Sequence, residues 1–354
     1  MSWKDFLRDG LLETKAYDVP LPDGRIKLDA MENPYTWPST MRADWLRELE
    51  KIDVNRYPDA SARDLKQQLR DTYQIHADYD LLIGNGSDEL IQLVCAAFAS
   101  EGATVLSVDP AFVVYRSAAS LYGLSFETVQ LDDHFELDIA AMLAAIEKFQ
   151  PAVIFLAYPN NPTGNLFDIN ALRKIIEIAP GLVVVDEAYQ PFARVSWLEE
   201  GLADHVVVMR TLSKFGLAGL RLGYMVGQRA VISELNKLRM PYNVNTLSME
   251  TACFALRHHT VFDEQADHIL RERSRMQQAL GRFASLEVFA SDANFILVRA
   301  SGAGEPLFDH LLQSGIRVKN LTGSGGSLTD CLRVTIGKPD QNDSLLTALD
   351  DFYQ

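Results

Sequence analysis

Short apolar runs alternate with amphipathic stretches through the middle of the chain, and this alternation is its clearest pattern. The runs are rich in β-branched residues and almost continuous, which is typical of strands buried on both faces of a mainly parallel sheet covered by helices. Because ligands gather at the carboxyl ends of such strands, we expect functional residues directly after each run. The runs predict strands at 103–109, 152–159, 182–189, 205–211 and 223–227.

The two ends of the chain show different patterns. The first ~40 residues are irregular and rich in turn signals, and helical periodicity begins only after them. Beyond residue 245, a charged helical stretch at about 261–283 precedes short strands and two further helices. We therefore expect an α/β fold with three parts: an N-terminal segment, 1–42, that packs with a small domain; a large domain, 43–245; and the small α+β domain itself, 246–354.

Composition narrows the possible partners and the compartment. The net charge of −15 argues against nucleic acid and anionic membrane as partners. The start lacks a secretory signal, and no apolar run approaches the ~20 residues of a membrane span. The three cysteines form neither a CxxC pair nor a disulfide pattern, which favours a reducing compartment. These features predict a cytoplasmic protein with no membrane or nucleic-acid partner and no metal site.

Polar residues follow two of the predicted strands. Asn161 lies in "NNPTG" after one strand, where the same residues also suit an ordinary turn. Asp186 follows three valines, so its carboxylate would be desolvated and needs a partner. That partner is a helix end, a structural ion pair or a cationic group of a ligand. Tyr189 comes three residues later, and its phenol can reach the same pocket.

The stretch "TLSKFGLAGLRLGY", residues 211–224, places Lys214 among hydroxyl, glycine and small apolar residues. A buried lysine loses affinity for its proton, and a neutral amine attacks carbonyl carbons, as Schiff-base chemistry requires. A lysine that extends its charged end to solvent is the competing interpretation. Arg221 follows after seven positions, close behind Thr211 and Ser213.

A glycine loop at 84–86 is followed by a predicted helix that begins near Ser87 or Asp88. The N–H groups at such a helix start can hold a phosphate. Position 89 is glutamate rather than the third glycine of a dinucleotide fingerprint, so an NAD site fits poorly. Together with the lysine, carboxylate, amide and phenol, this loop describes a site for an aromatic aldehyde with a ring nitrogen and a phosphate, which is pyridoxal 5′-phosphate (PLP).

These motifs, in this order, resemble the fold type I PLP-dependent aminotransferases, and among them the histidinol-phosphate aminotransferase family. The resemblance runs nearly end to end and implies an enzyme with a large PLP-binding domain. It rests on "LDAMENPY" (28–35), "NRYPD" (55–59), "GNGSDELI" (84–91), "YPNNPTG" (158–164), "VVVDEAY" (183–189), "RTLSKFGLAGLRLGY" (210–224) and "CLRVTIG" (331–337).

The resemblance implies a role for each cofactor residue. Lys214 forms the Schiff base and then moves a proton, Asp186 pairs with the ring nitrogen, and Asn161 and Tyr189 bond the phenolic oxygen. Phe112 stacks on the ring or belongs to the ordinary core. The residues expected to bind the phosphate are Ser87, Asp88, Thr211, Ser213 and Arg221. Tyr57 is expected to reach the phosphate of a neighbouring subunit, which implies a homodimer.

The resemblance also implies the substrates, an amino donor and a 2-oxo acid. Arg333 corresponds to the arginine that binds the carboxylate and can serve a substrate phosphate. Lys319 stands where many relatives carry arginine for that phosphate. Tyr17 and Asn33 match positions that close over the substrate, although a purely local structural role suits each nearly as well.

The leading hypothesis is amino transfer between L-histidinol phosphate and 2-oxoglutarate. An aromatic or broad-specificity aminotransferase and a threonine-phosphate decarboxylase of the same fold are alternatives that the sequence separates poorly. A PLP-binding sensor joined to a DNA-binding module is disfavoured by the acidic charge. The spacing from Lys214 to Arg221 is one residue shorter than the commoner eight, so we expect either a tighter turn or a displaced arginine.

Overall fold

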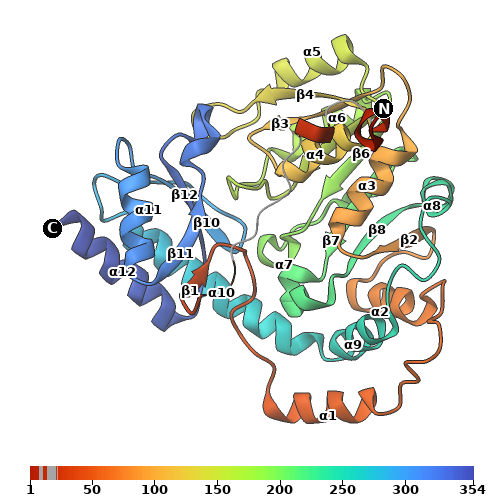
Figure 1. Cartoon of the computed structure of the whole chain (residues 1–354), viewed down its shortest axis with the longest axis horizontal. Coiled ribbons are helices and arrows are strands. Elements are labelled where there is room, and N and C mark those ends of the chain that lie inside the picture. The colour runs from red at the N-terminus through yellow and green to blue at the C-terminus, as the bar shows by residue number, and fades with distance from the viewer. Residues whose placement is uncertain (8–10, 14–20, 22) are drawn as a thin grey trace.

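The computed structural model describes residues 1–7, 11–13, 21 and 23–354. Two lobes share one chain, and each is built around its own sheet (Figure 1). None of the described helices is both long and apolar enough to cross a membrane.

The large lobe holds a seven-stranded sheet in the order β2-β8-β7-β6-β5-β3-β4. Only β8 runs against its neighbours, so the predicted mainly parallel sheet is confirmed. The edge strand β4 escaped prediction because its side chains are mostly half-exposed and its sequence, SFETVQ, is polar. The strands are β2 (Tyr79–Gly84), β3 (Thr104–Asp109), β4 (Ser125–Gln130), β5 (Val153–Ala157), β6 (Leu182–Asp186), β7 (Val206–Thr211) and β8 (Gly223–Gln228).

Helices cover both faces of this sheet, which explains why its strands are continuously apolar. Within β6, Val183 and Val185 join one core while Val184 joins the core on the opposite face. Alternate side chains of a strand point to opposite faces, so a doubly covered strand needs apolar residues at every position. The helices of this lobe are α1 (Ser39–Leu49), α2 (Arg63–Tyr73), α3 (Ser87–Ala97), α4 (Val113–Leu121), α5 (Ile139–Phe149), α6 (Ile169–Ile178), α7 (Gln190–Ala193), α8 (Arg229–Asn236) and α9 (Thr246–Arg257).

The small lobe holds a five-stranded sheet in the order β1-β11-β12-β10-β9. Strand β1, from the N-terminal segment, pairs in parallel with β11, so the two ends of the sequence share one sheet (Figure 1). Its elements are β1 (Ile26–Leu28), β9 (Glu287–Val288), β10 (Phe295–Arg299), β11 (Ile316–Asn320), β12 (Cys331–Thr335), α10 (His259–Leu280), α11 (Gly304–Gln313) and α12 (Pro339–Tyr353).

The two cores meet along the long helix α10. Phe262, near its start, belongs to the large core, whereas Ala266 and Ile269 belong to the small one. Helix α9 packs against α1 and α2 and contributes to the large core. The change of core therefore falls inside α10, and the division of the chain at 42 and 245 stays a prediction.

Candidate active site

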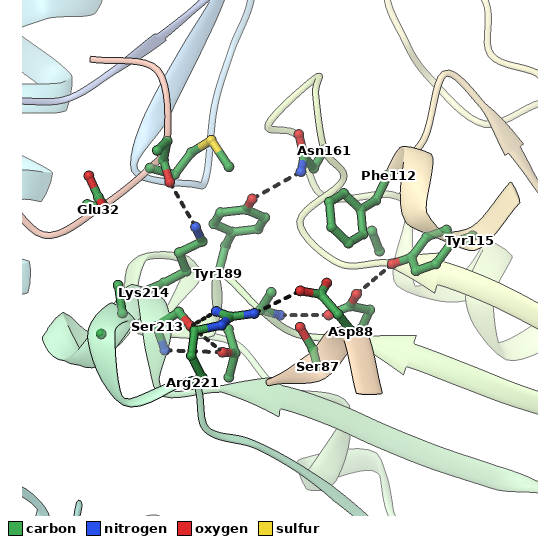
Figure 2. Close-up of a pocket in the computed structure, with 18 residues that line it drawn as sticks. Glu32, Ser87, Asp88, Phe112, Tyr115, Asn161, Tyr189, Ser213, Lys214 and Arg221 are labelled. Atoms are coloured by element: carbon green, nitrogen blue, oxygen red, sulfur yellow. Dashed lines mark hydrogen bonds and ion pairs between the residues drawn. The ribbon is translucent and has the colours of Figure 1, made fainter. Parts of the chain in front are cut away.

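A cavity of about 390 Å³ lies at the carboxyl ends of β5, β6 and β7, where the sequence predicts functional residues (Figure 2). Helices α3 and α4 supply one side of it, and the segment after β1 supplies another. Among the predicted site residues, the cavity brings together Ser87, Asp88, Phe112, Asn161, Asp186, Tyr189, Thr211, Ser213, Lys214 and Arg221.

Lys214 lies on the cavity wall in the irregular turn that follows β7. Its Nζ donates a hydrogen bond to the carbonyl oxygen of Ala30 at 3.0 Å and lies 5.9 Å from the centre of the Tyr189 ring. Burial, followed by the positive charge of Arg333, lowers the pKa of Lys214 to about 8. About one-tenth of the amine is therefore neutral at pH 7, far more than for an ordinary lysine, and the neutral amine is the form that attacks a carbonyl.

The turn that holds Lys214 is irregular and reaches Arg221 after seven positions. Residues Ser213–Leu217 form a π-type turn with Gly216 at a φ of 128°, and Ala218–Leu220 form a 3-10 turn. Arg221 then adopts a left-handed φ of 54°. This path returns the Arg221 guanidinium to within 3.4 Å of the Ser213 hydroxyl, so the arginine is not displaced.

Asp186 is the last residue of β6 and is buried. Burial raises its pKa to about 6, while hydrogen bonds from the Tyr115 hydroxyl at 2.6 Å and the Ala188 N–H at 3.1 Å oppose that rise. A carboxylate with a pKa near 6 in an apolar pocket is suited to a cationic partner, which stabilises its ionised form.

Tyr189 and Asn161 form a second polar group on the cavity wall. The Asn161 amide nitrogen donates to the Tyr189 hydroxyl at 3.1 Å, and both side chains are buried. The guanidinium of Arg333 donates to the Asn161 side-chain oxygen and, at 3.1 Å, to the carbonyl of Asp29. Arg333, which is buried, therefore reaches from the small sheet to the edge of the cavity.

The end of the cavity where the sequence predicts a phosphate lies where the Lys214 turn meets the start of α3. The Arg221 guanidinium pairs with Asp88 at 2.8 Å, and the Thr211 hydroxyl donates to Ser213 at 3.0 Å. Two glycines allow this approach. A Cβ at Gly86 would lie 2.8 Å from an Arg221 nitrogen, and one at Gly223 would lie 2.5 Å from the Ser87 backbone nitrogen.

Comparisons with known proteins agree with this geometry. Residues 24–349 match the family model described as aminotransferase class I and II. The histidinol-phosphate aminotransferase 2 of Nitrosococcus oceani is 49% identical over 348 residues, which cover 97% of this chain and 96% of that protein. The chain belongs to the class I and II aminotransferases.

Solved structures share the fold at lower identity. The histidinol-phosphate aminotransferase of Clostridium acetobutylicum superposes with a TM-score of 0.85 at 23% identity, over 93% of this chain and 99% of that one. The enzyme of the same name from Sinorhizobium meliloti, solved with pyridoxal-5′-phosphate, gives a TM-score of 0.83 at 23% identity, over 92% and 90% of the two chains. The predicted fold type I architecture is confirmed, and the family is PLP-dependent.

The donor set of this aminotransferase fits PLP. The glycines leave room at the start of α3 for a phosphate beside Ser213 and Arg221. Asp186 offers a buried carboxylate for a protonated ring nitrogen, and Tyr189 with Asn161 offers hydrogen bonds for a phenolic oxygen. Lys214 offers a buried amine of the kind that an aldehyde group requires.

Four predicted residues of this aminotransferase are not among those lining the cavity. Asn33 donates to Gln265 at 2.8 Å and to the Phe215 carbonyl at 3.4 Å, and it accepts from the Tyr35 N–H at 2.9 Å. Tyr57 is 81% exposed and stacks on Tyr242. Lys319 and Arg333 lie on the small sheet. Tyr17 lies outside the described residues, and the roles assigned to all these side chains stay predictions.

Sequence reasoning missed two titratable side chains that line the cavity of the aminotransferase, Tyr115 and Glu32. Tyr115 lies three residues after Phe112, at the start of α4, and this helical spacing places both on the side of the cavity. Glu32 lies beside the predicted Asn33, lines the cavity and pairs with Lys27 at 2.7 Å. The spacing in "FVVY" was a usable signal for Tyr115, whereas Glu32 depends on how the N-terminal segment folds back.

Proposed function

We propose that this aminotransferase moves the amino group between L-histidinol phosphate and 2-oxoglutarate, giving imidazole acetol phosphate and L-glutamate. The main support is that one cavity combines Lys214, whose pKa is lowered, with the buried carboxylate of Asp186 and a helix start suited to phosphate. Arg333 borders this cavity through its hydrogen bond to Asn161. The name and 49% identity of the Nitrosococcus oceani relative support the choice of substrate.

Each polar residue of the cavity has a separate role in the proposed reaction. PLP, when bound, supplies the electron sink that allows the Cα–H bond of the amino donor to break. Lys214 would hold the cofactor through its aldehyde group, and its amine would move the proton at Cα of the donor. Asp186 would accept a hydrogen bond from the protonated ring nitrogen, and Tyr189 with Asn161 would orient the phenolic oxygen. Thr211, Ser213, Arg221 and the start of α3 hold the phosphate.

Two cations of the small sheet would bind the anionic ends of the substrates. Lys319 and Arg333 occupy directly opposite positions on the antiparallel strands β11 and β12, so both side chains project from the same face. Like charges opposite each other are unfavourable, and an anion between them removes that repulsion. The phosphate of histidinol phosphate and the carboxylates of glutamate are such anions.

We also infer a homodimer in the cytoplasm. Tyr57 is 81% exposed, although the motif to which it belongs implies a phosphate contact, and a second copy of the chain would give it that contact. The three cysteines are free, buried thiols, which suits a reducing compartment.

The experiment that tests the substrate compares L-histidinol phosphate with L-phenylalanine as amino donors for wild type and Lys319→Ala. Loss of the lysine removes a charge-assisted hydrogen bond, so kcat/KM should fall about tenfold for the phosphate donor and little for phenylalanine. Lys237→Ala is the control and should change neither value, because Lys237 lies just after α8 in an exposed ion pair with Glu234. Equal losses with both donors, or a preference of wild type for phenylalanine, would contradict the proposal.

A further inference from the structure

Tyr115 has a fixed position against the carboxylate that faces the cofactor site. Its side chain is fully buried, and its ring stacks on Phe155 with centres 4.6 Å apart and planes 8° apart. The Tyr115 and Phe112 rings are nearly perpendicular, with centres 5.6 Å apart and planes at 87°. The hydroxyl of this ring makes one hydrogen bond with the described residues, to the Oδ2 atom of Asp186 at 2.6 Å.

The direction of this hydrogen bond follows from the two groups. Burial raises the pKa of the Tyr115 phenol well above its ordinary value, so the phenol keeps its proton and donates it to the carboxylate. The other oxygen of Asp186 accepts the N–H of Ala188. With one donor on each oxygen, the carboxylate cannot rotate freely, and its remaining lone pairs are directed by the protein rather than by solvent.

We propose that Tyr115 is a positioning residue that holds Asp186 ionised and correctly oriented toward the ring nitrogen of the cofactor. This inference rests on the proposed function, because it assumes that the ring nitrogen is the partner of Asp186. The start of α4 would then have two roles. Phe112 would cover the face of the cofactor ring, and Tyr115, one turn later, would orient the Asp186 carboxylate at the edge of that ring.

The other charged and titratable groups around Asp186 do not replace this donor. Asp88 from α3 and Glu187, its neighbour along the chain, both raise the pKa of Asp186 through their negative charge. Tyr189, at the start of α7, donates no hydrogen bond to Asp186 among the described contacts and lies beside Asn161 instead. Tyr115 is therefore the side chain that opposes protonation of the buried carboxylate.

The test uses pyridoxamine 5′-phosphate, which has the ring nitrogen and phosphate but cannot bond covalently to Lys214. Its Kd is measured by fluorescence titration of the full-length protein as wild type, Tyr115→Phe, Asp186→Asn and the double variant. Tyr115→Phe should weaken binding about tenfold at pH 7, as expected for a hydrogen bond to a charged group. In the Asp186→Asn background the same change should have less than about a twofold effect, since only the carboxylate uses the hydroxyl.

The pH dependence provides a second readout that a merely structural role would not move. Binding should weaken as the pH falls and Asp186 takes up a proton, and in Tyr115→Phe this should begin at higher pH because the carboxylate has lost a donor. Titrations of the ligand and of Lys214 are common to all variants, and Asp186→Asn shows them without that of the Asp186 carboxylate. Tyr158→Phe, at another buried tyrosine whose side chain does not line the cavity, should match wild type.

The outcomes separate this inference from the function on which it rests. If Tyr115→Phe weakens binding equally in the wild-type and Asp186→Asn backgrounds, or leaves the pH profile unchanged, the role of Tyr115 is overturned while the aminotransferase proposal stays intact. Failure of the wild-type protein to bind pyridoxamine 5′-phosphate would overturn both. An unfolding temperature of Tyr115→Phe equal to that of wild type without ligand confirms that any loss of binding is local.

Discussion

The guanidinium of Arg221 lies 2.8 Å from the carboxylate of Asp88, and this ion pair joins the end of the lysine turn to the first turn of α3. Both side chains are about half exposed, so the pair itself adds little to stability. The pair holds the guanidinium next to the N–H groups at the start of α3. A phosphate bound there can accept hydrogen bonds from both.

Arg221→Ala should therefore weaken cofactor binding without unfolding the protein. Loss of a charge-assisted hydrogen bond to phosphate corresponds to about a tenfold to hundredfold rise in the Kd of PLP, measured by titration of the apoprotein. Arg282→Ala is a matched control, since its ion pair with Asp350 is equally exposed and lies at the C-terminal end of the chain. An equally large rise in the Kd for Arg282→Ala would contradict this prediction, because it would show that the loss of one positive charge anywhere on the protein weakens binding.

The rate at which PLP bonds to the apoprotein should rise with pH through about 8. Burial lowers the pKa of Lys214 to about 8, and only the neutral amine attacks the aldehyde. The amine is then roughly one-tenth neutral at pH 7 and mostly neutral at pH 9. Stopped-flow absorbance after mixing apoprotein with PLP gives this profile, and a midpoint near the ordinary lysine value of 10.5 would contradict it.

Asp186→Asn should stabilise the apoprotein while impairing catalysis. The folded-state pKa of about 6 lies above the ordinary 3.8, so the folded chain binds the proton more tightly than the unfolded chain. Stability is therefore lost as the pH rises from about 4 to 6, and asparagine avoids that loss, which is about 3 kcal/mol at pH 7. Urea unfolding at pH 7 and pH 4.5 should show a gain that shrinks at the lower pH.

Gly223→Ala should both destabilise the protein and weaken phosphate binding. The new Cβ would lie 2.5 Å from the Ser87 nitrogen and 2.7 Å from the Gly86 carbonyl carbon, so backbone has to move at the anion site. We expect a loss of about 1–3 kcal/mol in the free energy of unfolding, together with a higher Kd for PLP. Gly323→Ala is the control, because nothing lies within 4 Å of its Cβ.

Much of the large lobe could be predicted from the sequence because its strands are buried on both faces. Continuous β-branched runs mark such strands, and their carboxyl ends mark the site, which is why Asn161, Asp186 and Lys214 were found together. Strand β4 and helix α9 were harder to place. The first is a polar edge strand, and the second follows a change in pattern although it packs in the large core.

The remaining parts of the site depend on contacts between distant segments. Glu32 reaches the cavity only because β1 pairs with β11 and directs the next residues over Lys214. The hydrogen bond from Tyr115 to Asp186 joins residues 71 positions apart. Local periodicity predicts which face of a helix is buried, but not which strand end that face contacts. Contacts between distant residues, such as Tyr115 and Asp186, are therefore seen only in the folded structure.

The most direct measurement is the half-reaction of the PLP-loaded protein with single amino donors, followed by the visible absorbance of the bound cofactor. L-histidinol phosphate should abolish the visible band, and 2-oxoglutarate should then restore it, whereas Lys214→Ala should show neither change. L-phenylalanine and O-phospho-L-threonine should react far more slowly. A band that L-phenylalanine removes and L-histidinol phosphate does not, or a protein that never acquires the band, would contradict the account.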